Sequence, residues 1–546
     1  MSSRGQLRVE LESGERHEIP IGGDDQSLAD VLAAQGWPLN TRCGQRGLCH
    51  GCEVLLREGA LTSEQGIVTA PATVQACQTR LNGSAVILVP ARSRIEHRPQ
   101  VCETFEIAIP CAHQPLFPPM PGHRDTAFAV DVGTTTVVVL LVDLVTGEVL
   151  SEAGAFNEQI HFGDNVLTRI DVARNPENLA AMQRAVVKDT IQPLLVSACE
   201  RAGRSAKRLG GGAVAGNTTM LHLLVGEDPT SLGVAPFTPR FLAPRRASAA
   251  DIGLTTEGLA ADTPVQLLPG IAAYIGADIA AGMLATGMCY DARPSLLIDI
   301  GTNGEIVLQA EGRLSACATA AGPAFEGSGL CCGTRAQEGA VSHVRLNMAP
   351  FEIEAQTIGA VPLGRAHGLC GSAYIDFLAT GRSSGFLQTN GRFDPTAWET
   401  VPASRRHTGD SARAVRLADE NGSPALRISE ADIARLLQAK AAIGAGIEVL
   451  LELAGLRAAD VNRVYLAGGF GMHVNVGHAI GIGLLPGFRE DQVRVVGNTA
   501  LAGALLALVD RTTLDEMENL RAQVAVVELN LTDGFEDRYI EHLLLP

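Results

Sequence analysis

The sequence predicts a multidomain α/β protein, and three observations lead to this expectation. Four cysteines gather near the N-terminus, within residues 43–77. Further along, an apolar strand, an aspartate, a Gly-Thr turn and a second apolar strand occur together twice, around Asp131 and around Asp299. The chain has 546 residues, which is too many for one hydrophobic core and indicates roughly two to four domains.

The four cysteines, Cys43, Cys49, Cys52 and Cys77, have the spacing that a [2Fe–2S] cluster requires of a small electron-transfer domain. Two irons bridged by sulfides need two thiolates each. The glycines at 44, 47 and 51 allow the loop to wrap around the cluster with its backbone N–H groups toward the sulfurs. These four thiolates are therefore the predicted cluster ligands.

The segments around the cysteines predict a β-grasp fold of the ferredoxin type over residues 1–90. Residues 5–22 form a predicted β-hairpin, because apolar residues alternate with polar ones on both sides of the turn at 13–14. Ser27 is placed to cap a short helix that ends at Gly36. Strands are expected at 53–56 and 85–89, on either side of Cys77.

Residues 91–126 are predicted to be a proline-rich linker, since seven prolines lie between positions 90 and 125. Such a composition favours an extended, semi-rigid connector. Cys102, Cys111, His113 and His123 fall within it, but their irregular spacing does not indicate a metal site. We expect the connector to let the cluster domain move between partners.

Composition disfavours several classes of function. A formal charge of −17 and a pI near 5.3 oppose binding to nucleic acid or to an anionic membrane. The first residues contain no apolar run with a cleavage site, so we expect a cytoplasmic protein. The apolar stretch from Leu267 to Met288 contains Asp278, and we interpret it as a buried helix rather than a membrane span.

Residues 127–290 and 291–546 are expected to be the two lobes of a duplicated fold with a cleft between them. Each carries one Asp-x-Gly-Thr motif between apolar strands, and the two aspartates are 168 residues apart. In such a loop glycine lets the backbone approach a phosphate, while threonine hydroxyls and successive N–H groups donate hydrogen bonds to its oxygens. The aspartates at the strand ends are predicted to hold Mg²⁺, directly or through water. The predicted residues are Asp131, Gly133, Thr134 and Thr135 in the first loop and Asp299, Gly301, Thr302 and Asn303 in the second.

A third element completes the predicted nucleotide site. A short strand leads into Gly468, Gly469 and Phe470, where an adenosine has room to lie flat against the backbone, and an apolar helix opens at 497–503. The order phosphate, phosphate, adenosine is that of the superfamily of actin, Hsp70 and the acetate and sugar kinases, so we predict an actin-like (ASKHA) fold that binds ATP. The sequence shows neither a P-loop nor a dinucleotide fingerprint. Glu305 and Glu326 are the candidate carboxylates for activating water.

Together these motifs resemble those of the reductive activators of corrinoid proteins, ATPases that pair an N-terminal [2Fe–2S] domain with an actin-like region. The resemblance covers the chain from residue 7 onward. It is carried by segments 131–136, 157–170, 216–222, 299–305, 321–327 and 467–471.

The resemblance implies a function. A member of this family binds a corrinoid methyl-transfer protein whose cobalt has become oxidised to Co(II), and returns one electron to restore Co(I), with electrons from a reductase or a ferredoxin. The cobalt couple lies below a plant-type cluster at about −400 mV, so ATP must bias the transfer. Arg42, Arg46, His50 and Arg80 around the cysteines either steer an acidic donor or form a solvated rim. A homodimer is compatible with the sequence.

Three other functions fit parts of the sequence. Activators of 2-hydroxyacyl-CoA dehydratases share the actin-like fold, but they resemble homodimers bridged by one [4Fe–4S] cluster, with few cysteines per chain. A small-molecule kinase with an appended redox domain would use the same phosphate loops. A binding module would hold nucleotide without turning it over. The separate four-cysteine domain opposes the first alternative, and the products of ATP turnover distinguish the other two.

Overall fold

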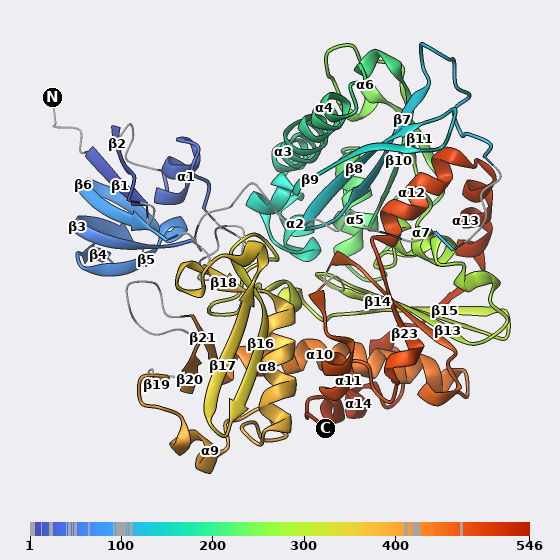
Figure 1. The fold of residues 1–546 in the computed structure, drawn as a ribbon. Coiled ribbons are helices and arrows are strands. Elements are labelled where there is room, and N and C mark those ends of the chain that lie inside the picture. The colour runs from blue at the N-terminus through green and yellow to red at the C-terminus, as the bar shows by residue number, and fades with distance from the viewer. Residues whose placement is uncertain are drawn as a thin grey trace. The chain divides into compact units, whose positions relative to one another are not determined.

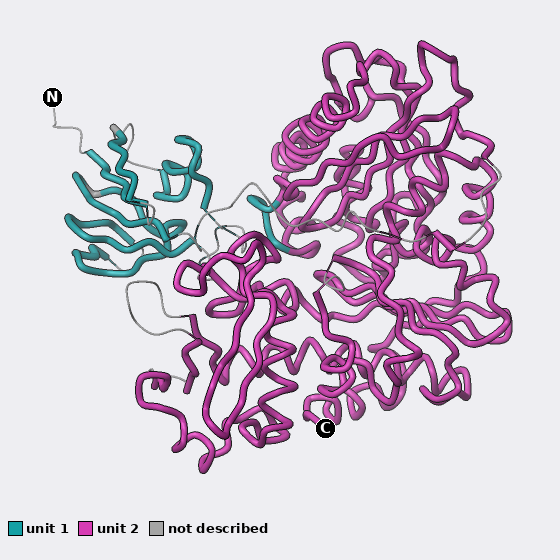
Figure 2. The backbone as a smooth tube through the Cα atoms, viewed as in Figure 1, with its two compact units in different colours: residues 1–97, 160–164 teal, residues 98–159, 165–546 magenta. Residues whose placement is uncertain are grey.

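The computed structural model describes residues 6–11, 14–20, 26–39, 41, 45, 47, 52–63, 66–90, 93, 105, 107–108, 113–408, 413–417, 426–469 and 473–546. The backbone divides into two compact units (Figure 2). The first unit comprises residues 1–97 and 160–164, and the second comprises residues 98–159 and 165–546.

Over its described residues, the first unit contains a mixed six-stranded sheet and the short helix α1. The strands follow the order β2-β1-β6-β3-β4, and β5 pairs with β3. Strands β1 and β2 form the predicted antiparallel hairpin, and β1 runs parallel to β6. The strands are β1 (Gln6–Leu11), β2 (Arg16–Pro20), β3 (Glu53–Ser63), β4 (Gly66–Thr69), β5 (Ala72–Gln75) and β6 (Thr79–Val89).

Helix α1 (Leu28–Ala33) begins where the sequence predicts it. The Ser27 hydroxyl accepts a hydrogen bond from the backbone N–H of Asp30 at 3.1 Å, which satisfies one of the helix's unpaired donors. Leu28 and Leu32 are fully buried in the same core as the inward-facing residues of β1 and β6. The hairpin, the helix and the parallel β1–β6 pair confirm the predicted β-grasp arrangement.

The second unit contains two large sheets with matching topology (Figure 1). In the first sheet, β10 runs parallel to β7, and β7, β8 and β9 follow as antiparallel neighbours. In the second sheet, β22, β13, β14 and β15 repeat this pattern. The duplication predicted from the two Asp-x-Gly-Thr motifs is thus confirmed at the level of strand pairing.

The strands of both sheets have the following bounds. The first sheet, in the order β11-β12-β10-β7-β8-β9, consists of β7 (Thr126–Val132), β8 (Thr136–Asp143), β9 (Val149–Phe156), β10 (Leu209–Gly216), β11 (Arg245–Ser248) and β12 (Pro264–Leu267). The second sheet, in the order β23-β22-β13-β14-β15-β24, consists of β13 (Ser295–Ile300), β14 (Gly304–Ala310), β15 (Arg313–Thr319), β22 (Arg463–Ala467), β23 (Val493–Gly497) and β24 (Val524–Val526).

Helices α7 (Ala277–Ala285) and α12 (Thr499–Val509) pack against each other between the two sheets (Figure 1). Helix α12 contacts β7 and β10 of the first sheet, while Ile279 and Met283 of α7 share a core with Leu297 of the second. The two helices approach closely at Gly503, where a Cβ atom would lie 2.3 Å from the Cβ of Ala281. Only glycine fits this crossing without a shift of one helix.

The other helices cover the outer faces or carry the smaller sheets. The helices are α2 (Val166–Val172), α3 (Pro176–Val186), α4 (Gln192–Arg201), α5 (Thr218–Leu224), α6 (Ala249–Ile252), α8 (Gly371–Ser383), α9 (Pro395–Thr400), α10 (Glu430–Leu453), α11 (Val476–Gly481), α13 (Thr512–Gln523) and α14 (Phe535–His542). Two three-stranded sheets consist of β16 (Ala340–Met348), β17 (Phe351–Thr357) and β18 (Gly368–Leu369), and of β19 (Arg406–Thr408), β20 (Arg413–Arg416) and β21 (Arg427–Ser429).

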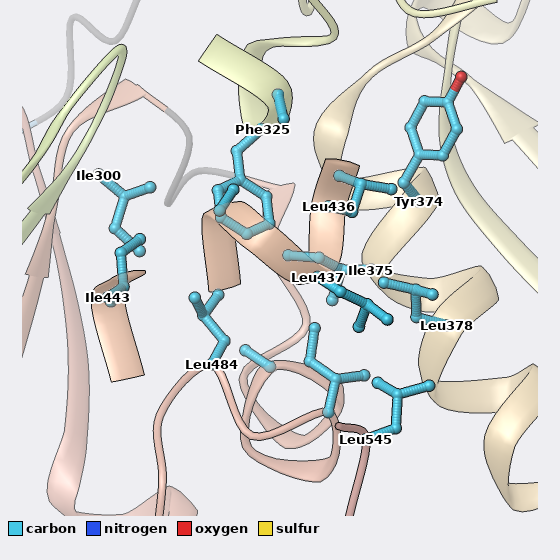
Figure 3. Close-up of a cluster of buried hydrophobic side chains, with 14 of the residues drawn as sticks. Ile300, Phe325, Tyr374, Ile375, Leu378, Leu436, Leu437, Ile443, Leu484 and Leu545 are labelled. Carbon is cyan, nitrogen blue, oxygen red and sulfur yellow. The ribbon is translucent and has the colours of Figure 1, made fainter. Parts of the chain in front are cut away.

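A large hydrophobic core joins the second sheet to helices α8 and α10. Figure 3 shows Phe325 directed into this core, together with Ile300, Ile443 and Leu484. Phe325 is 2 % exposed and belongs to a short 3₁₀ turn, Pro323–Glu326. The core therefore anchors the turn that places Glu326.

The described residues of the predicted linker lie along the second unit. Phe105 and Ile107 pack against Ala285 of α7 and against α12, and the Leu116 backbone N–H donates to the Leu508 carbonyl at 2.9 Å. Phe117 is 5 % exposed and fills space beside Gly211, where a Cβ atom would lie 2.2 Å from its ring. These described linker residues are therefore attached to the second unit.

The apolar stretch at 267–288 is only partly helical. Strand β12 ends at Leu267, and α7 begins only at Ala277 after a turn in which the backbone N–H of Gly270 donates to the Leu242 carbonyl. The expectation of one buried helix is therefore corrected to a strand end, a turn and a nine-residue helix. Among the helices that the structure describes, none combines the length and the hydropathy of a membrane span.

Candidate nucleotide and iron–sulfur sites

The first phosphate loop, residues 131–136, is a tight turn between β7 and β8. The backbone N–H of Gly133 donates to the Thr136 carbonyl at 3.0 Å, and a Cβ atom on Gly133 would lie 2.6 Å from that oxygen. Glycine is therefore required for this hairpin. Asp131 lies at the end of β7 and Thr134 and Thr135 at the tip of the turn.

Buried polar side chains hold the first phosphate loop from behind. Arg169 is fully buried and donates to the Thr134 carbonyl at 2.6 Å, and Asn157 donates to the Gly133 carbonyl at 2.9 Å. Asn217, the N-cap of α5, donates to the Thr134 hydroxyl at 3.0 Å. Segments 157–170 and 216–222, part of the family resemblance, thus fix the conformation of this loop.

The second phosphate loop, residues 299–304, repeats this construction between β13 and β14. The Gly301 backbone N–H donates to the Asn303 carbonyl at 2.9 Å. Asp299 and Glu305 face each other across the hairpin as register partners. Strand β22 lies beside β13, and Gly468 follows it with φ +90°; a Cβ atom there would lie 2.5 Å from Oδ1 of Asp299.

One cavity brings these elements together. Its lining includes the predicted residues of both phosphate loops, Gly468, Gly469, Glu305 and Glu326. Phe470 and Gly471 lie outside the described residues. The cavity thus has walls from both large sheets, as a duplicated fold with a cleft would provide.

Glu326 connects the two phosphate loops. Its Oε2 accepts a hydrogen bond from the Thr135 hydroxyl at 2.9 Å and another from the Thr302 hydroxyl at 3.1 Å. A carboxylate oxygen therefore lies where hydroxyl donors of both loops converge. Such a position suits an oxygen of a phosphate or of a water equally well.

Buried carboxylates dominate the electrostatics of the cavity. Burial raises the pKa of Asp131 to about 7, against a hydrogen bond from Asn498, and raises the pKa of Asp299 to about 8 with help from neighbouring carboxylates. Burial also raises the pKa of Asp278 to about 6 and holds that of Glu305 well above its usual range. A bound cation would offset this crowding of negative charge.

The carboxylates do not form a closed metal cage. Within the described part of the chain, no three His, Cys, Asp or Glu side chains converge closely enough to hold a metal ion by themselves. Mg²⁺ is usually held by one or two carboxylates, with waters and phosphate oxygens completing its shell. Asp131 and Asp299 can serve in that arrangement.

Several residues of the cavity were not predicted as site residues, and three of them are polar or charged groups of particular interest. Asp278 lies in the first turn of α7, Asn498 caps α12 and donates to Asp131 at 2.8 Å, and Arg335 lines the wall. Of the lining residues that the structure describes, Arg335 alone carries a guanidinium or ammonium group. Its guanidinium carbon lies 5.3 Å from the centre of the Phe156 ring, which is cation–π distance.

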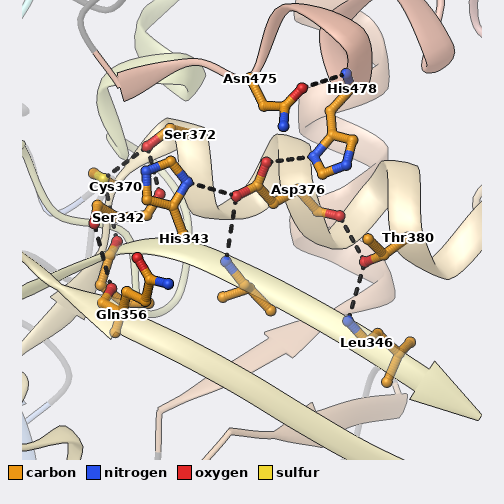
Figure 4. A network of polar contacts seen from close by, with 12 residues as sticks. Ser342, His343, Leu346, Gln356, Cys370, Ser372, Asp376, Thr380, Asn475 and His478 are labelled. Carbon is orange, nitrogen blue, oxygen red and sulfur yellow. Dashed lines mark hydrogen bonds and ion pairs between the residues drawn. The ribbon is translucent and has the colours of Figure 1, made fainter.

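Helix α8 presents its N-terminus to the same cavity, through Gly371 and Ser372. Figure 4 shows how this helix is fixed: the Ser372 hydroxyl donates to the Ser342 carbonyl at 2.7 Å, and Asp376 contacts two histidines. The Nδ1 atoms of His343 and His478 lie 2.9 and 2.6 Å from the Asp376 carboxylate oxygens. Asp376 thereby ties α8 to β16 and to α11.

In the first unit, the Cys52 carbonyl accepts a hydrogen bond at 3.1 Å from the backbone N–H of Ala76, the residue before Cys77. Cys52 is fully buried and Cys77 is 7 % exposed. Gly47 has φ +69°, and a Cβ atom there would lie 2.9 Å from Cγ of Gln78. The other two predicted ligands, Cys43 and Cys49, lie outside the described residues, as do Gly44, Gly51, Arg42, Arg46 and His50.

The described part of this site fits a [2Fe–2S] cluster. Cys52 and Cys77 are both buried, and Gly47 of the ligand loop, with φ +69°, packs against the side chain of Gln78, the residue after Cys77. Arg80, predicted on the cluster rim, is an exposed residue of β6.

Of the four connector residues not expected to bind metal, Cys102 and Cys111 lie outside the described residues, and His113 contacts the Val145 carbonyl at 2.9 Å.

The fold and the two sites define a class of protein in which a [2Fe–2S] domain is joined to an ASKHA domain. Residues 11–82 match the family model of the 2Fe-2S iron-sulfur cluster binding domain. Residues 126–291 match the RACo middle region, and residues 293–546 match the C-terminal domain of RACo, the ASKHA domain.

Comparison with individual proteins narrows the class to one family. A solved structure, the reductive activator for corrinoid, iron-sulfur protein, is 30% identical, covers 99% of this chain and 98% of its own, and superposes with a TM-score of 0.71. The corrinoid activation enzyme RamQ of Eubacterium limosum is 27% identical over 96% of each chain. The [Co(II) methylated amine-specific corrinoid protein] reductase of Methanosarcina barkeri is 25% identical over 76% of this chain and 75% of its own. The chain belongs to the family of reductive activators of corrinoid proteins, which confirms the resemblance and the predicted fold class.

Proposed function

We propose that this chain is an ATP-dependent reductive activator that passes one electron through its [2Fe–2S] cluster to the Co(II) form of a corrinoid protein, and so restores Co(I) for methyl transfer. The observation that carries this proposal is the extent of the similarity to the solved activator, which spans both units of this chain and covers 99% of this chain and 98% of that one. An electron carrier and an ATPase cleft therefore occur together in one chain.

The cluster, when bound, supplies a one-electron carrier. Cys43, Cys49, Cys52 and Cys77 are the proposed ligands, and the burial of Cys52 and Cys77 supports this role for the described pair. A reductase or a ferredoxin is the proposed electron donor. Residues 1–90 would form the cluster domain and 91–126 the linker to the ATPase lobes at 127–290 and 291–546.

The proposed roles in the cavity follow from the contacts. Thr134 and Thr135 of the first loop and Thr302 of the second would donate hydrogen bonds to phosphate oxygens, as Thr135 and Thr302 already do to Glu326. Gly133 and Gly301 would shape the two turns, since their own N–H groups donate within the hairpins, and Asn303 would bring its backbone N–H close to the phosphates. Gly468, Gly469 and Phe470 would receive the adenosine.

The charges of the cavity side chains indicate which of them would face Mg²⁺ and which would face the phosphates. Asp131 and Asp299 end matching strands of the two sheets, so a metal between them and the phosphates would be reached from both halves of the fold. A Mg-bound triphosphate still carries net negative charge. Arg335 is the described cationic residue best placed to offset it, because it lines the cavity and is steadied by Phe156.

Glu326 is the better of the two candidates for orienting the attacking water. It accepts hydrogen bonds from both phosphate loops, so it lies where both walls of the cavity can present a phosphate. Glu305 instead faces Asp299 in the hairpin, and burial keeps its pKa well above the ordinary range. The hydrogen bonds of Glu326 to both phosphate loops therefore favour it over Glu305.

The difference in reduction potential between the cluster and the cobalt explains why ATP is needed. The cobalt couple lies below a plant-type cluster at about −400 mV, and each shortfall of about 59 mV costs about 1.4 kcal/mol for one electron. Nucleotide held by both phosphate loops would favour a closed cleft, and closure can change the surface that meets the corrinoid partner. ATP would in this way bias the transfer or the release that follows it. The active form is either a monomer or the homodimer that the sequence allows.

The deciding experiment follows the cobalt spectrum. The cluster-loaded full chain is mixed with a corrinoid protein in its Co(II) form and a low-potential reductant, with Mg-ATP, with Mg-ADP or without nucleotide. We expect the Co(I) spectrum only with Mg-ATP. Equal cobalt reduction in all three mixtures, or a reconstituted chain without iron, contradicts the proposal.

A further inference from the structure

Gln78, the residue after the last predicted cluster ligand, reaches back to the ligand loop. Its Nε2 donates to the carbonyl oxygen of Gln45 at 2.5 Å, and it lies 3.3 Å from the carbonyl oxygen and 3.5 Å from Sγ of Cys77, both in hydrogen-bonding geometry. Gln78 ends the short 3₁₀ turn Ala76–Gln78, directly before β6. One side-chain amide therefore contacts both the loop and a ligand sulfur.

Packing fixes the position of this amide. Gly47 approaches the Gln78 side chain so closely that a Cβ atom would lie 3.0 Å from its Cδ. On the neighbouring turn, the Gln75 side chain donates to the Gly47 carbonyl at 3.2 Å, and the Thr79 hydroxyl donates to the Gln75 carbonyl at 3.2 Å. These contacts hold the turn that contains Gln78 against the loop that contains Gly47, and they keep the Gln78 amide next to the sulfur of Cys77.

We propose that Gln78 is a positioning residue that sets the reduction potential of the cluster through its hydrogen bond to the Cys77 sulfur. The inference rests on the proposed function only in assuming that the cluster is present. An N–H donor disperses negative charge on a ligand sulfur, and that charge grows when the cluster accepts an electron. The hydrogen bond therefore stabilises the reduced form and raises the potential.

Raising the potential of the cluster affects the two electron transfers in opposite ways. A higher potential makes the cluster easier for its donor to reduce and leaves a larger gap between the cluster and cobalt. ATP would close that gap. Gln78 would thus help the donor to reduce the cluster, and ATP bound in the nucleotide cleft would help the cluster to reduce cobalt.

The test compares cluster potentials in the full-length, cluster-loaded protein. Gln78→Met keeps the length of the side chain and removes its donor. EPR-monitored redox titration should give a more negative midpoint, with the ratio of reduced to oxidised cluster at a fixed potential lowered severalfold; a tenfold fall corresponds to about 59 mV.

Two matched variants control for a loosened site. Gln75→Met removes an amide that supports Gly47, and Thr79→Val removes a hydroxyl from the turn that carries Cys77. Both should shift the midpoint less than Gln78→Met does. An unchanged midpoint in Gln78→Met, or an equal shift in the three variants, overturns the inference.

A measurement on protein with Gln78 intact covers the case in which Gln78→Met fails to assemble its cluster. The reduced protein, labelled with ¹⁵N in the glutamine side-chain amides, should show a coupling between the cluster spin and ¹⁵N in pulsed EPR. The coupling should persist in Gln75→Met. Its absence from the wild-type spectrum overturns the inference.

Failure of this inference is distinct from failure of the proposed function. A shifted midpoint without ATP-dependent cobalt reduction would support the role of Gln78 and contradict the activator proposal. Cobalt reduction with an unshifted midpoint would do the reverse.

Discussion

Glu326 shows how a single side chain can be placed by three separate parts of the fold. Phe325 holds its turn in the core, and one threonine of each phosphate loop donates to its carboxylate. Its backbone is thus fixed while its carboxylate remains in the cavity. A phosphate that enters the cavity would compete for the same hydroxyl donors, so Glu326 would be released toward water when ATP binds.

We expect Glu326→Gln to lower the rate of ATP hydrolysis about 100-fold, because an amide cannot accept a proton from water. Nucleotide affinity should change little, since the amide oxygen can still accept from a threonine hydroxyl. Phosphate release measures the rate, and calorimetric titration with ATP measures the affinity.

Glu338→Gln is the matched control for this variant. Glu338 is exposed and does not belong to the cavity lining, so hydrolysis should stay at the wild-type rate. Wild-type turnover in Glu326→Gln would rule out its proposed role. A loss of ATP binding with unchanged turnover per bound nucleotide would assign Glu326 to loop support alone.

At the residue scale, sequence patterns located side chains that lie on turns with a motif, and they missed those that arrive from distant segments. The two Asp-x-Gly-Thr loops could be found because spacing alone defines them. Arg335 has no such motif: it lines the cavity from a segment that is distant in sequence from both phosphate loops. Asp278 could have been predicted as a site residue from the sequence, since a lone carboxylate in an apolar segment is seldom buried without a functional role.

At the scale of elements, the crossing of α7 and α12 joins stability to the site. Helix α7 carries Asp278, and the cap of α12 is Asn498, which donates to Asp131. The helices touch at Gly503, directly against Ala281. A change in their separation would therefore move two groups of the cavity together.

We expect Gly503→Val to destabilise the protein by about 1 to 3 kcal/mol, because the added carbons overlap α7. ATP binding should weaken as well. Urea unfolding followed by circular dichroism gives the first quantity, and calorimetry the second.

Gly481→Ala in α11 provides the comparison for Gly503→Val. No atom outside the immediate chain lies within 4 Å of a Cβ built there, so the change should be neutral or slightly stabilising. If Gly503→Val unfolds at the wild-type urea concentration, the helix crossing does not have the tight packing described.

A buried lysine makes stability depend on pH. Lys440 of α10 is 1 % exposed and donates to the Leu544 carbonyl at 2.8 Å, and burial lowers its pKa to about 8. Between this pKa and the unfolded value of about 10.4, the unfolded chain binds more protons than the folded one. The free energy of unfolding therefore rises with pH in this window. Below it, Lys440 is charged in both states, and the full destabilisation caused by burying its charge is present.

We expect wild type to gain about 2 kcal/mol relative to Lys440→Met as the pH rises from about 7.5 to about 9.5. The difference between the two proteins matters, because other groups titrate equally in both. Urea unfolding at the two pH values measures it. A difference that stays constant with pH would mean that Lys440 is not buried in charged form.

Local patterns predicted the elements that carry strong local signals. The capped helix α1 and the hairpins around both phosphate loops were found from alternation and capping residues. The segment at 267–288 was not, because hydropathy does not distinguish a strand end and a turn from a helix when all three are buried. Local patterns also could not predict that the linker residues from 105 onward pack against the second unit, since their contacts with α7 and α12 involve residues far away in the sequence.

At the scale of the whole molecule, duplication explains why one cavity can sense one ligand from two sides. The paired sheets present matching loops whose threonines meet at Glu326. The proposed cluster ligands belong to a separate compact unit. Such a division predicts that the two chemistries can be removed one at a time.

Cys49→Ser and Asp299→Ala test this division together. Cys49→Ser should lose the visible absorption of the cluster and all cobalt reduction, yet bind ATP as wild type does, because its change lies in the cluster loop. Asp299→Ala should keep the cluster absorption and lose Mg-ATP hydrolysis, because it removes a carboxylate proposed to face Mg²⁺. Absorption spectra, ATP titration and phosphate release separate the two defects. If Cys49→Ser still reduced cobalt normally with a physiological donor, or if hydrolysis persisted unchanged in Asp299→Ala, the electron or the nucleotide would have to use another site.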